Sequence, residues 1–170
     1  MSDLAMPCVR NWSHPSLDNF AKAGLFHYSK SFSDVVTACR GRLCYLATPY
    51  TKVAVDADGA WDASASLECA VLAARCARAL ALEGVTAVSP IIQAAEMINA
   101  DIISQALDPL DGGFWLRWCW PLLNSADAII VPDFDGWAES DGIWAEVRAA
   151  LTTNRRVFLL DQSEILGGRV

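Results

Sequence analysis

The chain has 170 residues, of which 54% are hydrophobic and 19% are charged, and its net charge is −7 at pH 7. This composition excludes a disordered chain, and the length suits one domain with a substantial core. The negative charge argues against nucleic-acid polymers and anionic membranes as partners, since both require an extended basic surface. It leaves room for a small anionic ligand, because a helix N-terminus can bind a phosphate locally.

The six cysteines form no C-x-x-C pair, and no secretory signal accompanies them. The longest apolar stretch is interrupted by Arg75 and Arg78, so it is too polar to cross a bilayer. We therefore expect reduced, mostly buried thiols in a cytoplasmic protein that does not bind membranes.

Residues 1–41 show weak periodicity and are expected to form an N-terminal extension, with a short helix over residues 34–39. The domain itself is expected to span residues 42–170. It opens with "RLCYLATPY", residues 42–50, which is typical of a buried strand ended by a proline. The alanine-rich residues 62–83 predict a long helix.

Strands and helices continue to alternate along the rest of the chain. This alternation indicates a doubly wound, flavodoxin-like α/β sandwich, with a four- or five-stranded, mainly parallel sheet and helices on both faces. The remaining predicted elements are a strand at 85–90, helices at 91–108 and 114–125, a strand at 127–132, a helix at 140–153 and a strand at 156–161.

Ligands of such folds bind at the carboxyl ends of the strands, near the point where the strand order reverses. This rule selects the loops at residues 47–59, 89–93 and 132–140. The third loop leads into the predicted helix at 140–153 through the stretch "DFDGWAESDGIWAEV". Functional residues are therefore expected in this stretch.

Glu146 has no basic residue three or four positions away, which is unusual for a glutamate on a surface helix. The predicted helix buries a stripe that includes Ile143 and Val147, and Glu146 lies at the edge of that stripe. A carboxylate there is partly removed from water, which raises its pKa and suits it to a reaction. The alternative is that Glu146 accepts a hydrogen bond from a core tryptophan or from a neighbouring subunit.

Several residues near Glu146 have two interpretations. Ser140 and Gly142 open the helix either as an ordinary cap or as an anion site. Trp137 either stacks on a nucleobase or packs in the core or an interface. Asp133 and Asp135 are either catalytic acids or part of a solvated loop.

The loop after the first predicted strand supplies further candidates for substrate binding. It contains Thr48, Tyr50 and Lys52, which offer hydroxyl groups and one positive charge to the expected crevice. Both histidines lie within residues 1–41, and the chain has no glycine-rich nucleotide motif, nucleophile elbow or H-E-x-x-H motif. We therefore expect no metal, no cofactor, and chemistry carried by carboxylates.

Four ordered segments carry a family resemblance. "CYLATPYTK", "VSPII", "ADAIIVPDFDGWAESDGIWAEVRAAL" and "RRVFLLD" together resemble the nucleoside 2-deoxyribosyltransferase superfamily over residues 42–161. The third segment is similar to a signature of small bacterial members of undefined function, "GW-x-x-S-x-G-x-x-x-E". The signature residues here are Gly136, Trp137, Ser140, Gly142 and Glu146.

The resemblance implies roles for these residues. In that superfamily the glutamate on this helix attacks C1′ of the sugar, which points to Glu146 as the nucleophile. Members that hydrolyse deoxynucleoside 5′-monophosphates carry a serine and a glycine that match Ser140 and Gly142, and the serine helps to bind the phosphate. The pocket of those proteins also includes the loop after the first strand, and we add Gly136 and Trp137 as substrate-binding candidates.

One position departs from the superfamily pattern. Characterised members place an aspartate, the partner of the reacting base, eight residues before the aspartate that leads the strand. With Asp127 as that leading residue, Cys119 stands at this position. A thiol transfers a proton poorly at neutral pH, so that either Asp133 or Asp135 replaces the acid, or the enzyme is weak, or the protein is not an enzyme.

The expected function is cleavage or transfer at the N-glycosidic bond of a small-molecule nucleoside or nucleoside 5′-monophosphate, through a glutamate nucleophile. The alternative is a non-catalytic nucleotide-binding or sensing module, and a more distant one is a structural dimer subunit. A homodimer or higher homo-oligomer is expected, because the helix at 62–83 and the seven tryptophans supply more apolar surface than one sheet needs.

Overall fold

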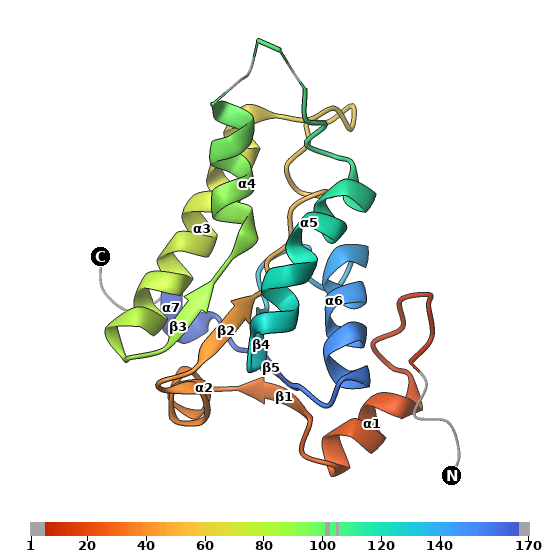
Figure 1. The fold of residues 1–170 in the computed structure, drawn as a ribbon, viewed down its shortest axis with the longest axis vertical. Helices are drawn as coiled ribbons and strands as arrows, with labels where there is room; N and C mark the ends of the chain where they lie inside the picture. Colours follow the sequence, from red (N-terminus) through yellow and green to blue (C-terminus); the bar gives the residue numbers. More distant parts are fainter. Residues whose placement is uncertain (1–5, 101–102, 105, 167–170) are drawn as a thin grey trace.

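The computed structural model describes residues 6–100, 103–104 and 106–166. Figure 1 shows a parallel sheet flanked by helices on both sides. The strands are β1 (Phe26–Lys30), β2 (Leu43–Leu46), β3 (Thr86–Val88), β4 (Ala128–Pro132) and β5 (Arg156–Leu160). The helices are α1 (Pro15–Lys22), α2 (Phe32–Cys39), α3 (Ala63–Leu82), α4 (Pro90–Asn99), α5 (Gly112–Ser125), α6 (Asp141–Thr152) and α7 (Ser163–Leu166).

The sheet has five strands in the order β1-β5-β4-β2-β3, and every neighbouring pair is parallel. The α/β fold predicted from the sequence is confirmed, and the topology is consistent with a flavodoxin-like arrangement. From β2 the chain winds outward to β3, then returns to the other side of β2 to form β4 and β5. The strand order therefore reverses between β2 and β4, and their carboxyl ends define the expected crevice.

Alternate residues of the strands face two separate cores. Tyr45 of β2 packs with side chains of α1, α5 and α6, and Ile129 of β4 lies in the same cluster. Cys44 and Leu46 point to the other face, where they pack with α2 and α3. Because successive side chains of a strand alternate between faces, Tyr45 is directed toward the layer that contains α6.

The segment before Arg42 takes part in this sheet. β1 pairs with β5 at one edge, with Phe26 opposite Val157. Leu17 and Phe20 of α1 are buried in the same core cluster as Tyr45. Residues 1–41 were expected to form an N-terminal extension, but their described part, residues 6–41, contributes an edge strand and two packed helices.

The other predicted elements mostly agree with the structure. The short helix at 34–39 and the helices at 62–83, 114–125 and 140–153 are confirmed as α2, α3, α5 and α6, with boundaries shifted by two residues or fewer. No helix in the described ranges is both long and apolar enough to cross a membrane.

The prediction of one helix over residues 91–108 is wrong in its length. α4 ends at Asn99, and Asp108 lies in a loop. The apolar pattern continues past Asn99, but Ile103 is 98% exposed. Because most helices depend on burying an apolar face, an uncovered isoleucine gives no support for a longer helix. Residues 101, 102 and 105 of that prediction lie outside the described part.

Candidate functional site

A cavity of about 430 Å³ opens at the carboxyl end of β2, beside the point where the strand order reverses. Its walls come from the loop after β2, the start of α4, the N-terminal half of α5 and the first turns of α6. This is where the fold class places ligands. The sequence-predicted site residues that line the cavity are Thr48, Tyr50, Lys52, Ser140, Gly142 and Glu146.

Glu146 contributes a buried carboxylate to this cavity, with 9% of the residue exposed. The Tyr45 hydroxyl donates a hydrogen bond to Glu146 Oε1. Removal from water raises the pKa of Glu146 to about 7, and the bond from Tyr45 opposes that rise. The carboxyl group therefore changes its charge near neutral pH. Within the chain, the hydrogen-bond partner of this carboxyl group is Tyr45 and not a tryptophan.

Tyr45 also adjoins Cys119, so three polar side chains from three elements meet at the cavity floor. Cys119 lies on α5, lines the cavity and is 7% exposed. Burial, with the charge of Glu146 as a smaller cause, raises the pKa of the Cys119 thiol to about 11. Burial likewise holds the pKa of Tyr45 well above its usual range, so both groups keep their protons at neutral pH.

Ser140 caps α6, as its sequence position predicts. Its Oγ accepts a hydrogen bond of 3.2 Å from the amide of Ile143. A side chain added at Gly142 would meet only Ser140 Oγ, at 3.7 Å, so the backbone there is open to approach. The first turn of α6 thus presents backbone amides and an uncrowded glycine to the cavity.

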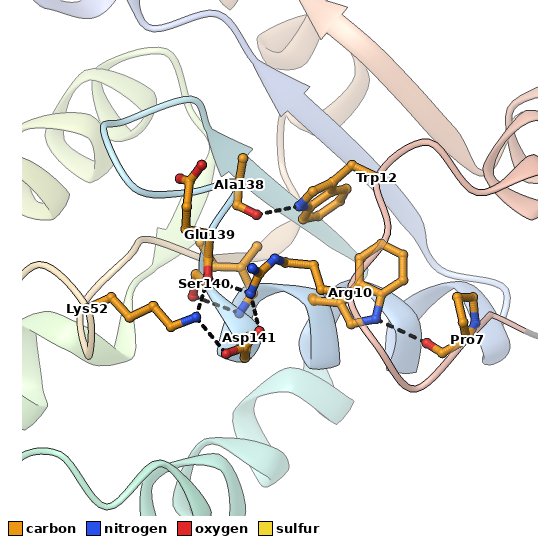
Figure 2. A network of polar contacts seen from close by, with 10 residues as sticks. Pro7, Arg10, Trp12, Lys52, Ala138, Glu139, Ser140 and Asp141 are labelled. Atoms are coloured by element: carbon orange, nitrogen blue, oxygen red, sulfur yellow. Dashed lines mark hydrogen bonds and ion pairs between the residues drawn. The ribbon is translucent and has the colours of Figure 1, made fainter.

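Lys52 and Arg10 converge on this helix start. The Lys52 ammonium group donates to Asp141 Oδ2 at 2.7 Å and to the Glu139 carbonyl at 2.8 Å. Arg10 donates to the same carbonyl at 2.6 Å and forms an ion pair with Asp141 (Figure 2). The bond from Lys52 is the largest cause of the lowered pKa of Asp141, and the charge of Arg10 adds to it. Two cations therefore hold one ionised aspartate.

Sequence reasoning missed Arg10 because it lies in the weakly patterned N-terminal segment. That segment is fastened to the loop before α6. Trp12 Nε1 donates to the Ala138 carbonyl at 2.8 Å (Figure 2). Trp144 Nε1 donates to the Pro7 carbonyl at 3.1 Å. Such contacts between distant segments leave no periodic signal in the sequence.

Trp137 belongs to this aromatic contact and is not among the residues that line the cavity. Its ring centroid lies 4.8 Å from that of Trp12, and Trp144 lies 4.9 Å from Trp12 in an edge-on arrangement. Of the two interpretations of Trp137, the geometry favours packing.

Tyr50 and Thr48 line the cavity but are held by neighbouring side chains. The Tyr50 hydroxyl lies 2.8 Å from Ser66 Oγ and accepts a bond of 3.0 Å from Trp61 Nε1. Thr48 Oγ1 lies 3.4 Å from Ser89 Oγ. These contacts fix the loop after β2 against α3 and α4, so that the wall of the cavity is shaped before any ligand enters.

The two aspartates predicted as substitute acids lie elsewhere. Asp133 Oδ1 accepts a bond of 2.8 Å from the amide of Gln162, at the end of β5. Asp135 is exposed and lines a second cavity of about 270 Å³, together with Glu68 and Phe134. Neither aspartate is among the residues that line the Glu146 cavity.

Gly136 acts through backbone geometry rather than through the cavity. Its φ of +84° lies in the left-handed region. A side chain at this position would come within 2.6 Å of Val53 Cγ1. Glycine is therefore needed here for the loop before α6 to pass close to the loop after β2.

Comparison with known proteins places the chain in a family whose function is not known. The family model described as "Domain of unknown function (DUF1937)" matches residues 42–162, so the chain belongs to this family. No curated protein and no solved structure matches the chain. The matched residues include Tyr45, Cys119 and Glu146, whereas Arg10 and Trp12 precede them.

Proposed function

We propose that this member of the DUF1937 family cleaves the N-glycosidic bond of a nucleoside or a nucleoside 5′-monophosphate, with Glu146 as the nucleophile. The observation that carries the proposal is the buried Glu146 carboxyl, held by Tyr45 on the floor of a cavity. The order and position of the motifs similar to nucleoside 2-deoxyribosyltransferases support it, because they assign the nucleophile to this same residue.

In the proposed reaction the ionised Glu146 attacks C1′ of the sugar. Tyr45 donates to Oε1, which keeps the carboxylate oriented and leaves Oε2 as the attacking atom. The bond between C1′ and the base nitrogen breaks, its electron pair stays on the nitrogen, which takes up a proton, and a glycosyl ester on Glu146 results. Water or a second base then attacks C1′ and releases the carboxylate. Such a double displacement retains the configuration at C1′.

The first turn of α6 is proposed to bind the 5′-phosphate. Ser140 and Gly142 bring a hydroxyl group and open backbone to the cavity, and the helix N-terminus adds a positive partial charge. Lys52 lies beside them, on the same side of the cavity. An anionic group bound there would leave the sugar between α6 and the cavity floor.

A second candidate function is favoured by one observation. Cys119 stands at the position where the resembling proteins have an aspartate, and its thiol keeps its proton. A site that lacks a strong acid could bind nucleotides without cleaving them. The same pocket would then serve as a nucleotide-sensing module.

One experiment separates the two functions. The protein is incubated with nucleosides and nucleoside 5′-monophosphates, while released base is measured by chromatography and binding by thermal stabilisation. Base release above that of a protein-free sample supports the enzyme. Stabilisation by a nucleotide without release supports the sensing module. If none of these ligands is cleaved and none stabilises the protein, both proposed functions are contradicted.

A further inference from the structure

The part of the cavity wall that α4 and α5 supply is largely apolar. Trp115 and Leu116 of α5 lie there with Pro90 and Ile91 at the start of α4, and Cys119 is the polar side chain that α5 adds. A sugar bound between Glu146 and the α6 N-terminus would direct its base toward this wall. Recognition of the base would therefore rest on ring contacts rather than on paired hydrogen bonds.

The lining side chains of the described part offer no strong acid to the departing base. Their carboxyl groups are those of Glu146 and Asp141. Glu146 is the proposed nucleophile, and Asp141 is held ionised by Lys52 and Arg10 at the N-terminus of α6. Tyr45 gives its proton to the bond with Glu146. Cys119 has a pKa of about 11, so it donates a proton poorly at neutral pH.

The need for an acid depends on the charge of the base. When the C1′–N bond of an ordinary nucleoside breaks, the electron pair stays on the base nitrogen, so the base leaves as an anion unless it is protonated. When the base is already a cation, as in an N7-alkylated purine or a pyridinium nucleotide, the same electron pair neutralises that cation. The base then leaves as a neutral molecule and takes up no proton.

We propose that this site acts on N-glycosides whose base is a cationic aromatic ring, which rests on the proposed function of Glu146. The reaction needs only the ionised nucleophile: the C1′–O bond to Glu146 forms, the C1′–N bond breaks, and the bonding pair neutralises the ring. Water then attacks C1′, loses one proton to solvent and releases the carboxylate. No oxidant, reductant or general acid enters either step.

The charges around the cavity suit a cationic ring. Lys52 is the one cation among its described lining residues, and Asp141 pairs with it away from the apolar wall. Trp115 lies on that wall, and its ring is fixed by a bond of 2.9 Å from Nε1 to the Asp108 carbonyl. The face of an indole attracts a cation, and the nearby Glu146 carboxylate does so as well.

A matched pair of substrates tests the inference. 2′-Deoxyguanosine 5′-monophosphate and its N7-methyl form differ by one methyl group and one positive charge. Spontaneous loss of the methylated base is measured with the Glu146→Gln variant and subtracted. We expect kcat/KM for the methylated nucleotide to be higher by about 100-fold or more, since a general acid contributes on the order of 10²–10⁴ in rate. Nicotinamide mononucleotide serves as a second cationic probe.

A substitution at Cys119 makes the test independent of the intrinsic reactivity of the substrates. Cys119→Asp restores an acid and is expected to narrow the ratio of the two kcat/KM values by at least about tenfold. Cys119→Ser, which is similar in size and not acidic, is expected to keep the wild-type ratio. If Cys119→Asp does not fold, wild-type rates for the two nucleotides within tenfold of each other would still overturn the inference.

The outcomes separate this inference from the proposed function. Release of both bases by the wild type at rates within tenfold of each other would overturn the preference for a cationic base and leave the nucleophile in place. A ratio unchanged in folded Cys119→Asp would also overturn it. The third outcome is that the wild type releases the base from none of the three substrates faster than Glu146→Gln does. The proposed function then fails, and this inference fails with it.

Discussion

The two cavities at the carboxyl edge of the sheet both contain acidic residues, yet their surroundings differ. The larger one encloses Glu146, which is 9% exposed and bonded to Tyr45. The smaller one is lined by Glu68 and Asp135, both of which are exposed. Thr48 lines both, so one loop separates them. Removal from water, rather than position after a strand, distinguishes the carboxylate suited to reaction.

The largest expected effect is a difference in base release between a variant in the larger cavity and a variant in the smaller one. Glu146→Gln keeps the shape of the side chain and an acceptor for Tyr45, but it removes the nucleophile. We expect base release to fall by on the order of 10⁴-fold. Asp135→Asn, a change of the same chemistry in the smaller cavity, is expected to retain most of the activity. Turnover of the best substrate by both variants is the measurement.

The reverse pattern would decide against this assignment of the two cavities. Loss of activity in Asp135→Asn with retention in Glu146→Gln would move the chemistry to the smaller cavity. Equal retention in both variants would show that neither carboxylate takes part. Thermal unfolding of each variant serves as the control for folding.

A second contrast concerns stability and pH. The pKa of Glu146 is about 7 in the folded protein, against 4.5 for an ordinary glutamate, because the carboxyl is buried. Between these values the folded state binds more protons than the unfolded state, so burial of Glu146 lowers stability as pH rises. The penalty is absent well below pH 4.5 and complete above about pH 7.

We therefore expect Glu146→Gln to gain free energy of unfolding relative to the wild type as pH rises from 5 to 8. The expected gain is about 2–3 kcal/mol. Urea denaturation of both proteins at each pH provides the measurement. Glu68→Gln, in the exposed cavity, is the matched control and should show no such gain. A difference between Glu146→Gln and wild type that does not change with pH would contradict the burial of a chargeable group.

A smaller effect concerns Ser140 and the phosphate. A nucleoside 5′-monophosphate is expected to bind better than its nucleoside by about 1.5–3 kcal/mol, the range for hydrogen bonds to a charged group. Ser140→Ala should reduce this preference and leave nucleoside binding little changed, with some stability lost from the cap. Calorimetric titration of both ligands, with Glu146→Gln as the background to prevent turnover, measures the difference.

Ser31→Ala supplies the control for Ser140→Ala. Ser31 caps α2, with Oγ accepting a bond of 3.1 Å from the amide of Asp34, and it does not line the larger cavity. This variant should lose similar stability while it keeps the preference for the monophosphate. If wild type binds nucleoside and monophosphate equally, the proposed phosphate site does not exist.

Much of the fold could be predicted from the sequence because its central strands and helices carry local signals. β4 is buried at every position, and an unbroken apolar run records this burial directly. α6 begins with a serine cap and buries a regular stripe. The lack of a basic neighbour for Glu146 was also a local signal, and it pointed to the buried carboxylate that the structure contains.

The rest could not be predicted because it depends on contacts between distant segments. β1 buries only Phe26, and its sequence FHYSK has no apolar run to mark a strand. In the sequence, Tyr45 looks like any other residue of a buried strand. Only the folded structure shows that it bonds to Glu146 on α6. Arg10 pairs with Asp141, which is 131 residues later in the sequence. Nothing in the spacing of Asp133 and Asp135 shows that they turn away from Glu146.

The position of β1 has a consequence for how the chain is made. A ribosome produces β1 first and β5 last, yet Phe26 of β1 has its partner Val157 on β5. β3 and β4 can each pair with β2 as they emerge, because β2 is already synthesised. β1 has no such neighbour and must remain unpaired in the sheet until β5 has been synthesised. The pairing of β1 with β5 is therefore among the last strand contacts that form as this sheet is synthesised.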